Sequence, residues 1–204
     1  TQSLCFVSKI DNSDPVAIIE GNTFSLEGDG DLIFDAGSSY DLYWGKEGLN
    51  YVWTLIRVET SGNVLIDTKE GQENSYFIVQ DDLSGNFVLS LLVSDLQGNT
   101  NYSDIGFSIE NVPPVGKLLV SEQSLTDGDI FKLPDLNEWT LDASDSIDTT
   151  NDLEGLRCVW KINYRTIYEG CERTLVWPEN DTNDTLLLTL EVIDDDEDYS
   201  SITV

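Results

Sequence analysis

Histidine and methionine are missing from this 204-residue chain, and lysine and arginine together supply only 10 residues. Without histidine, the common Ser–His and Cys–His ways of activating a nucleophile and imidazole zinc sites are excluded. The sequence also has no Gly-rich phosphate loop, no Gly-x-Ser-x-Gly motif and no Cys-x-x-Cys pair. Two carboxylates close to each other are expected by chance among 39 acidic residues, so such a pair indicates nothing by itself. We therefore expect a protein that is not an enzyme.

The scarcity of basic residues leaves a net charge of -29. Such a charge repels phosphate backbones and anionic lipids, which argues against nucleic acid as a partner and against direct membrane contact. No run of 18 apolar residues and no signal peptide is present. A solvated, aggregation-resistant surface explains most of the acidity, and cations are its natural counterparts.

One motif occurs twice at fixed spacing. Asp-Ala-x-x-Ser-x-Asp, five further residues and Glu-Gly-Leu-x-x-Val-Trp span residues 35–53 and again 142–160. The junction Asn-x-x-Pro-Val also recurs, beginning at Asn12 and at Asn111. We interpret the chain as a segment of a longer tandem array. The predicted units are the terminal strand of a preceding module at 1–12, one module at 13–112 and a second at 113–204.

The hydrophobic pattern is that of strands and not of helices. From Phe87 to Val93, and from Leu186 to Val192, apolar residues alternate with a period of two, which predicts strands with one face in a core. Seven short strands per module with one tryptophan on a central strand predict two tandem immunoglobulin-like β-sandwiches, an all-β fold. The expected strands are 16–20, 31–35, 51–58, 64–68, 76–79, 87–95 and 102–109, then 117–121, 139–142, 157–164, 166–169, 174–177, 186–193 and 201–204.

The repeated pieces resemble the polycystic-kidney-disease (PKD) module, which is widespread in microbial surface and secreted proteins. They are the Asn-x-x-Pro-Val junction, the Asp-Ala-x-x-Ser-x-Asp motif, Trp53 or Trp160, and the late strand ending in Val-Ser-Asp or Val-Ile-Asp. The PKD pattern continues after its tryptophan with Asp-Phe-Gly-Asp-Gly. Here Thr-Leu-Ile and Lys-Ile-Asn follow instead.

Calcium is the one cofactor that the sequence suggests, because the loops are rich in the oxygen ligands that this cation prefers. Some PKD-like and cadherin-like modules bind calcium where modules meet. By that resemblance, the candidate ligands are Asn12, Asp14 and Asp41 in the first copy and Asn111 and Asp148 in the second. The run Asp194, Asp195, Asp196, Glu197 and Asp198 adds five carboxylates in one turn. A solvated acidic turn without calcium is the competing interpretation.

Cys158 and Cys171 lie on either side of an expected hairpin around residues 165–166, which predicts a disulfide. Closing this loop contributes about 3 kcal/mol in the chain-entropy model and indicates an oxidising compartment. The counterpart of Cys158 in the first copy is Tyr51, so the bridge is a local staple. Cys5 has no evident partner, and we expect a buried thiol or a pair outside the chain. N-glycosylation signals occur at Asn101, Asn180 and Asn183.

The five tryptophans divide into two groups. Trp53 and Trp160 are expected to be core anchors between the sheets. Trp44, Trp139 and Trp177 have no counterpart in the other copy, which leaves open an exposed aromatic platform. Asp35 and Asp142 are expected to accept backbone N–H bonds in the loops that follow them.

These observations predict a structural spacer of a large extracellular surface protein, such as a surface layer, sheath, filament or adhesin. Its expected partners are neighbouring modules and other copies of the protein, and short junctions favour a stiff array. The alternative is a recognition module that binds polysaccharide or protein through loops near Trp44 or Trp177.

Overall fold

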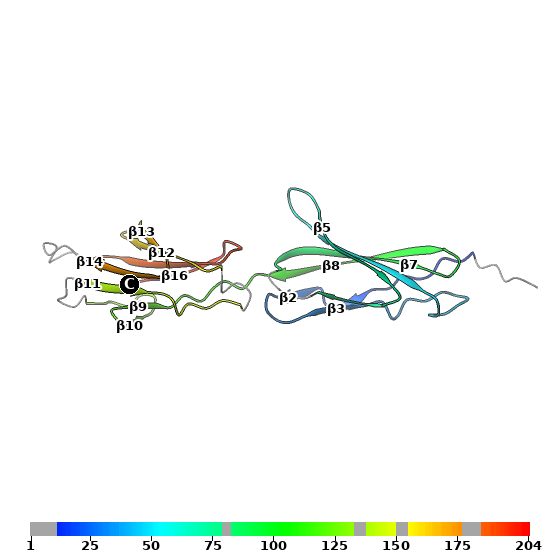
Figure 1. The fold of residues 1–204 in the computed structure, drawn as a ribbon, viewed down its shortest axis with the longest axis horizontal. Helices are drawn as coiled ribbons and strands as arrows, with labels where there is room; N and C mark the ends of the chain where they lie inside the picture. Colours follow the sequence, from blue (N-terminus) through cyan, green and yellow to red (C-terminus); the bar gives the residue numbers. More distant parts are fainter. Residues whose placement is uncertain (1–11, 79–82, 133–137, 150–154, 177–184) are drawn as a thin grey trace, which may run out of the picture. The chain divides into compact units, whose positions relative to one another are not determined.

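The computed structural model describes residues 12–78, 83–132, 138–149, 155–176 and 185–204, and every regular element in them is a strand. The chain divides into two compact units, and the boundary between them in the sequence lies between Glu110 and Asn111 (Figure 1). Apart from Asn12, the expected terminal strand at 1–12 lies outside the described residues.

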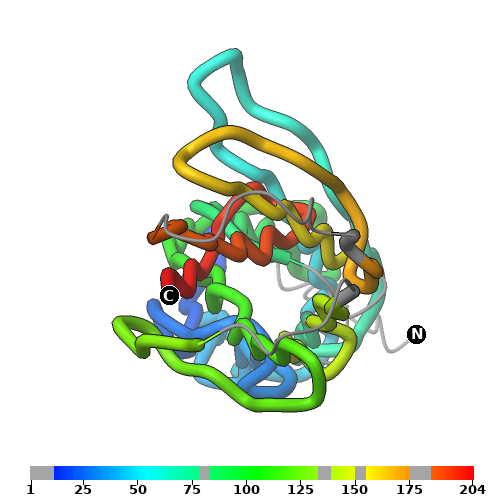
Figure 2. Tube along the Cα trace, turned by 90° about the vertical axis from the view of Figure 1, so that its left-hand side faces the viewer, coloured from blue at the N-terminus to red at the C-terminus, as the bar shows by residue number. Residues whose placement is uncertain are grey.

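The first module has two sheets. A three-stranded sheet has the order β1-β3-β6, and a five-stranded sheet has the order β2-β8-β7-β4-β5. The strands are β1 (Glu20–Gly21), β2 (Phe24–Leu26), β3 (Leu32–Asp35), β4 (Asn50–Arg57), β5 (Val64–Gly71), β6 (Ser75–Ile78), β7 (Gly85–Ser94) and β8 (Thr100–Glu110). The β4–β5 hairpin, with β5 in cyan, projects from its sheet in Figure 1 and in Figure 2.

The second module also has two sheets, each of four strands, ordered β10-β9-β11-β14 and β13-β12-β15-β16; β10 pairs with β9, whereas β2 of the first module pairs with β8. The strands are β9 (Leu118–Val120), β10 (Gln123–Leu125), β11 (Glu138–Asp142), β12 (Arg157–Ile162), β13 (Arg165–Glu169), β14 (Glu172–Val176), β15 (Leu188–Ile193) and β16 (Tyr199–Thr203). Each module is a β-sandwich of the immunoglobulin-like class, in which neighbouring strands are antiparallel except for β2, which pairs with β8 in parallel.

The alternation predicted for the late strands is confirmed. In β7, Leu89, Leu91 and Val93 are fully buried, and in β15 Leu190 and Val192 are fully buried. The side chains between them on each strand are more exposed. Each module therefore closes an apolar core of its own, because the inward faces of its two sheets meet.

Three strands and one turn differ from the expectation. The strand expected at 16–20 is limited to an isolated bridge between Val16 and Tyr40 and to β1 at Glu20–Gly21, because the segment between them bonds to the Ser39 hydroxyl through Ile18 instead of a neighbouring strand.

The sequence analysis did not predict β2 or β10, each three residues long and followed by Gly and Asp residues. The hairpin expected around residues 165–166 turns at Asn163 and Tyr164, which have φ angles of 49° and 67°. Two left-handed residues make the tight turn that suits the twist of the flanking strands, so β12 ends at Ile162 instead of Tyr164.

Candidate functional site

The repeated motif forms a clasp between strands of the first module. The Asp35 carboxylate accepts a bond from the Gly37 backbone N–H at 2.7 Å, as predicted. The buried Ser39 hydroxyl accepts a bond from the Ile18 N–H at 2.9 Å and donates one to the Ile18 carbonyl at 3.2 Å. The Ala36 N–H donates to the Asn74 carbonyl at 2.7 Å. The motif therefore ties the chain before β1 and the chain before β6 to the end of β3.

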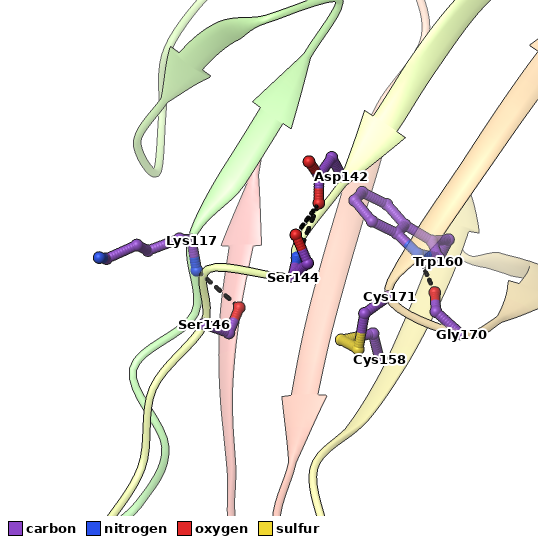
Figure 3. The surroundings of a disulfide bond; sticks show 8 residues. All are labelled: Lys117, Asp142, Ser144, Ser146, Cys158, Trp160, Gly170 and Cys171. Carbon is purple, nitrogen blue, oxygen red and sulfur yellow. Dashed lines mark hydrogen bonds between the residues drawn. A yellow bond between two sulfur atoms is a disulfide. The ribbon is translucent and has the colours of Figure 1, made fainter. Parts of the chain in front are cut away.

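The second module repeats the clasp, which Figure 3 shows beside the disulfide. The Asp142 carboxylate accepts a bond from the Ser144 N–H at 2.8 Å. The Ser146 hydroxyl accepts one from the Lys117 N–H at 3.0 Å (Figure 3). The Ala143 N–H donates to the Cys171 carbonyl at 2.7 Å. The recurrence of these bonds explains the recurrence of the motif by folding, because its polar groups satisfy backbone groups within each module.

The repeated tryptophans are core residues, as predicted. Trp53 is 2% exposed and Trp160 is fully buried. The Trp53 indole N–H donates to the Glu73 carbonyl at 3.3 Å, and the Trp160 indole N–H donates to the Gly170 carbonyl at 2.7 Å. Each ring packs in the core while its polar edge fixes the segment that crosses between sheets.

The structure contains the predicted disulfide between Cys158 and Cys171, whose Cα atoms are 4.9 Å apart. It joins β12 to the connection between β13 and β14, beside the Trp160–Gly170 bond (Figure 3). Tyr51, the counterpart of Cys158, is 5% exposed. Burial, and secondarily the negative charge of Asp35, raises the pKa of Tyr51. Cys5, for which we expected a buried thiol or a pair outside the chain, lies outside the described residues.

The candidate calcium ligands of the first module occupy two settings. Asn12 and Asp14 are exposed, and Ser13 between them donates a hydroxyl bond to the Asp41 carboxylate at 3.5 Å. Asp41 is 2% exposed and accepts bonds from the Tyr43 and Trp44 N–H groups at 2.7 and 2.8 Å. Asp41 therefore organises the loop after β3.

In the second module, three of the predicted ligands lie together. The Asn111 amide donates to the Asp194 carboxylate at 2.9 Å and to the Asp198 carboxylate at 3.3 Å. Asp194 is fully buried and also accepts a bond from the Asp198 N–H at 2.8 Å. Asp148 accepts a bond from the Thr149 N–H at 2.8 Å.

The rest of the acidic run is exposed. Asp195 and Asp196 are on the surface of the turn between β15 and β16, and Glu197 pairs with Arg157 through both carboxylate oxygens at 2.9 Å. Among the residues that the structure describes, no three His, Cys, Asp or Glu side chains are grouped so that they would hold a metal ion. Calcium binding stays a prediction.

Asp95 is the first-module counterpart of Asp194. Burial by itself would raise the pKa of Asp95, but hydrogen bonds from the Asn99 amide and from backbone N–H groups of the turn outweigh burial and lower it. The Asn99 amide donates at 2.8 Å, and the Gln97 and Asn99 N–H groups donate at 2.8 and 2.9 Å. This carboxylate therefore holds the turn in its charged form.

The remaining candidates have varied settings. Asn101 is exposed on β8. Trp139 is a buried residue at 5% exposure, so it is not part of an exposed platform. Trp44 is 37% exposed. Asn180, Asn183 and Trp177 lie outside the described residues.

The sequence analysis left open a recognition loop near Trp44, but it did not include the other apolar residues of this surface on the first module. The loop after β3 exposes Leu42 by 74% and Tyr43 by 53%, next to Trp44, and the turn after β7 exposes Leu96 by 68%. Gly48 allows Leu96 to lie against this loop, because a Cβ at Gly48 would be 2.5 Å from the Leu96 Cγ atom. The signal was present in the run Leu-Tyr-Trp between two polar motifs. The second module carries Asp195 and Asp196 where the first has Leu96 and Gln97.

No helix able to cross a membrane occurs in the described part of the chain.

Comparison with known proteins gives likeness of fold only. No protein-family model and no curated sequence matches the chain. Solved structures that resemble it include the fibronectin(III)-like modules of Clostridium thermocellum CbhA, with 13% identity, a TM-score of 0.32 and 92% coverage of both chains. The chicken CNTN1 FN1–FN3 domains share 10% identity with a TM-score of 0.33; the match covers 94% of this chain and 65% of that one.

A third neighbour is a structure titled for the promiscuous specificity of carbohydrate-binding modules from the β-sandwich superfamily. It has 13% identity and a TM-score of 0.41, and the match covers 95% of this chain and 85% of that one. The strand order and the two cores described above make the chain a pair of tandem immunoglobulin-like β-sandwich modules.

Proposed function

We propose that this chain is a non-enzymatic spacer segment of a large extracellular surface protein of the PKD-like type, from a microbial surface layer, sheath, filament or adhesin. The observation that carries the proposal is the use of the repeated polar residues. Asp35, Ser39, Asp142 and Ser146 hold backbone groups of their own modules, which is what a building block repeated for its shape requires.

Three further features support this role. The Cys158–Cys171 disulfide favours an oxidising compartment. The net charge of -29 favours a well-solvated surface. Such a surface resists aggregation where many modules and copies lie close together. The junction at residues 111–114 is short and contains Pro113 and Pro114, which restrict the backbone.

The test is to pull the chain by its ends in a force spectrometer. A spacer that bears load gives two discrete unfolding events, one per module. Reduction of the disulfide lengthens one event by about 40 Å, because the stretch from Cys158 to Cys171, with a sequence separation of 13, becomes extensible beyond the 4.9 Å that the bridge spans. Gradual extension without discrete events contradicts the load-bearing role.

Calcium stiffening is part of the proposal. The Asn111, Asp194 and Asp198 side chains meet at the start of the second module, where a cation would relieve the repulsion of the acidic run. Calorimetric melting with calcium and with chelator at fixed ionic strength tests this. Coincident melting temperatures contradict it.

A second candidate function is recognition of polysaccharide or protein. The exposed Leu42, Tyr43 and Trp44 of the first module favour it, because apolar and aromatic surface gathered on a loop is typical of binding sites. Binding on a glycan array that is lost in Trp44→Ala supports this function. An array without binding leaves the spacer role alone.

A further inference from the structure

The first module has a hollow of about 300 Å³ next to the clasp. Leu49 and Tyr51, both at most 5% exposed, contribute to its lining from within the core. Lys46, Gln72 and Asn74 are exposed lining residues and bring an ammonium group and two amides. Ligand sites usually have volumes of about 300 to 1,000 Å³, so this hollow suits a small unit.

The polar rim is held in place by groups of the core. The segment that carries Gln72 and Asn74 connects β5 to β6. The Trp53 indole N–H binds the Glu73 carbonyl, and the Ala36 N–H binds the Asn74 carbonyl. On the facing loop, the Lys46 ammonium donates to the Gly37 carbonyl. These bonds fix the backbone of the rim, so that binding there orders side chains and not the main chain.

The second module fills the same place with a covalent bond. Cys158 takes the place of Tyr51 in the repeat, and Cys171 takes the place of Asn74, since the Ala36 and Ala143 N–H groups bind the Asn74 and Cys171 carbonyls respectively. The two modules thus share a clasp, but the positions of Tyr51 and Asn74, which line the hollow in the first, carry the Cys158–Cys171 disulfide in the second.

We propose that the hollow of the first module binds one unit of a neutral saccharide. The amides of Gln72 and Asn74 each offer two donors and an acceptor. The net charge of -29 disfavours an anionic ligand. A neutral saccharide offers hydroxyl groups that hydrogen-bond the amides, and the negative charge of the protein does not repel it.

The neighbouring loop fits the same ligand. Lys46, Gly48 and Leu49 of the lining belong to the loop that exposes Tyr43 and Trp44. Aromatic faces pack against the C–H face of a pyranose, and amides bind its hydroxyl groups. This inference deepens the second candidate function and is independent of the spacer role, which needs no ligand.

The test uses the full chain and NMR titration with cellohexaose, xylohexaose, mannohexaose and maltohexaose, each up to about 10 mM. A saturable shift of the Lys46, Gln72 and Asn74 signals with one of the four is the expected result. The double variant Gln72→Ala/Asn74→Ala weakens binding roughly tenfold or more, because it removes both amides from an exposed rim. Gln123→Ala, an amide deletion on β10 of the second module, leaves binding unchanged and is the matched control.

Two results overturn the inference. One is the absence of a saturable shift with all four oligosaccharides. The other is binding that Trp44→Ala abolishes but Gln72→Ala/Asn74→Ala leaves intact. That result would place the saccharide on the loop and not in the hollow. Thermal melting of each variant is the control that distinguishes a loss of binding from a loss of folding.

Discussion

The two modules close the same clasp but reinforce it differently. In the first, Tyr51 lies at the place where the second has the Cys158–Cys171 disulfide. The first also has Tyr76, whose hydroxyl donates to the Asp67 carboxylate at 2.6 Å and whose ring lies 4.3 Å from the Lys69 ammonium. The Asp-Ala-x-x-Ser motif therefore specifies the fold, while the adjoining position is free to hold a staple or an open hollow.

The ends of the modules differ as much. The first exposes Leu42, Tyr43 and Leu96, and the second exposes Asp195 and Asp196. One framework therefore carries an apolar loop surface on one copy and an acidic one on the next. Loops that the framework does not constrain are where recognition is expected to evolve.

The largest expected effect separates the two cores. Trp160→Ala should destabilise the second module by about 3–5 kcal/mol, because it removes a fully buried side chain and leaves a cavity. The first module should keep its stability. Denaturant unfolding followed by resolved NMR signals of each module measures both, and Trp53→Ala is the matched variant with the opposite outcome. Equal loss in both modules would break the comparison.

Removal of the Cys158–Cys171 disulfide should have the next largest effect on stability. Cys158→Ala/Cys171→Ala should cost the second module about 3 kcal/mol, since the unfolded chain regains the freedom of the closed loop. Chemical denaturation with and without reductant measures this. The variant should respond no further to reductant. A variant as stable as the parent would show that packing around Trp160 suffices without the bond.

The clasp serines should have smaller, unequal effects. Ser39→Ala should cost about 1–3 kcal/mol, because the Ile18 N–H and carbonyl both lose a partner. Ser146→Ala removes the acceptor of the Lys117 N–H and should cost less. Urea unfolding of the two variants gives the order, and the reverse order would contradict this account of the clasp.

Ionisation of Tyr76 should lower the stability of the first module in alkali, whereas at neutral pH the tyrosine is not ionised and the stability is unchanged. Burial, followed by the hydrogen bond and negative charge of Asp67, raises the pKa of Tyr76 above its ordinary value of 10.0. A raised folded pKa means that the stabilisation is complete below pH 10 and is lost as pH rises toward the folded pKa. Melting between pH 9 and 12 measures this loss, which Tyr76→Phe should reduce. The counterpart in the second module is Arg173.

The sequence predicted the core strands well because their alternation follows directly from burial on one face, as in Leu89, Leu91 and Val93. It predicted the disulfide from spacing, although the hairpin turns at Asn163 and Tyr164. It missed β2 and β10, because strands of three residues carry too little periodicity to be recognised.

The hollow was not predictable from the sequence. It depends on three segments, around Gly37, Leu49 and Gln72, that only the folded chain brings together. The aligned repeats show that Tyr51 corresponds to Cys158. That Asn74 corresponds to Cys171 follows only from the structure, in which the Ala36 N–H binds the Asn74 carbonyl and the Ala143 N–H binds the Cys171 carbonyl.

Comparing NMR spectra of residues 13–110 alone, residues 111–204 alone and the whole chain tests most directly whether each half folds from its own residues. We expect the signals of each isolated half to overlay those of the same residues in the full chain, apart from residues near Asn111. Collapsed, poorly dispersed signals from either half would show that the sandwiches depend on each other and would contradict the account.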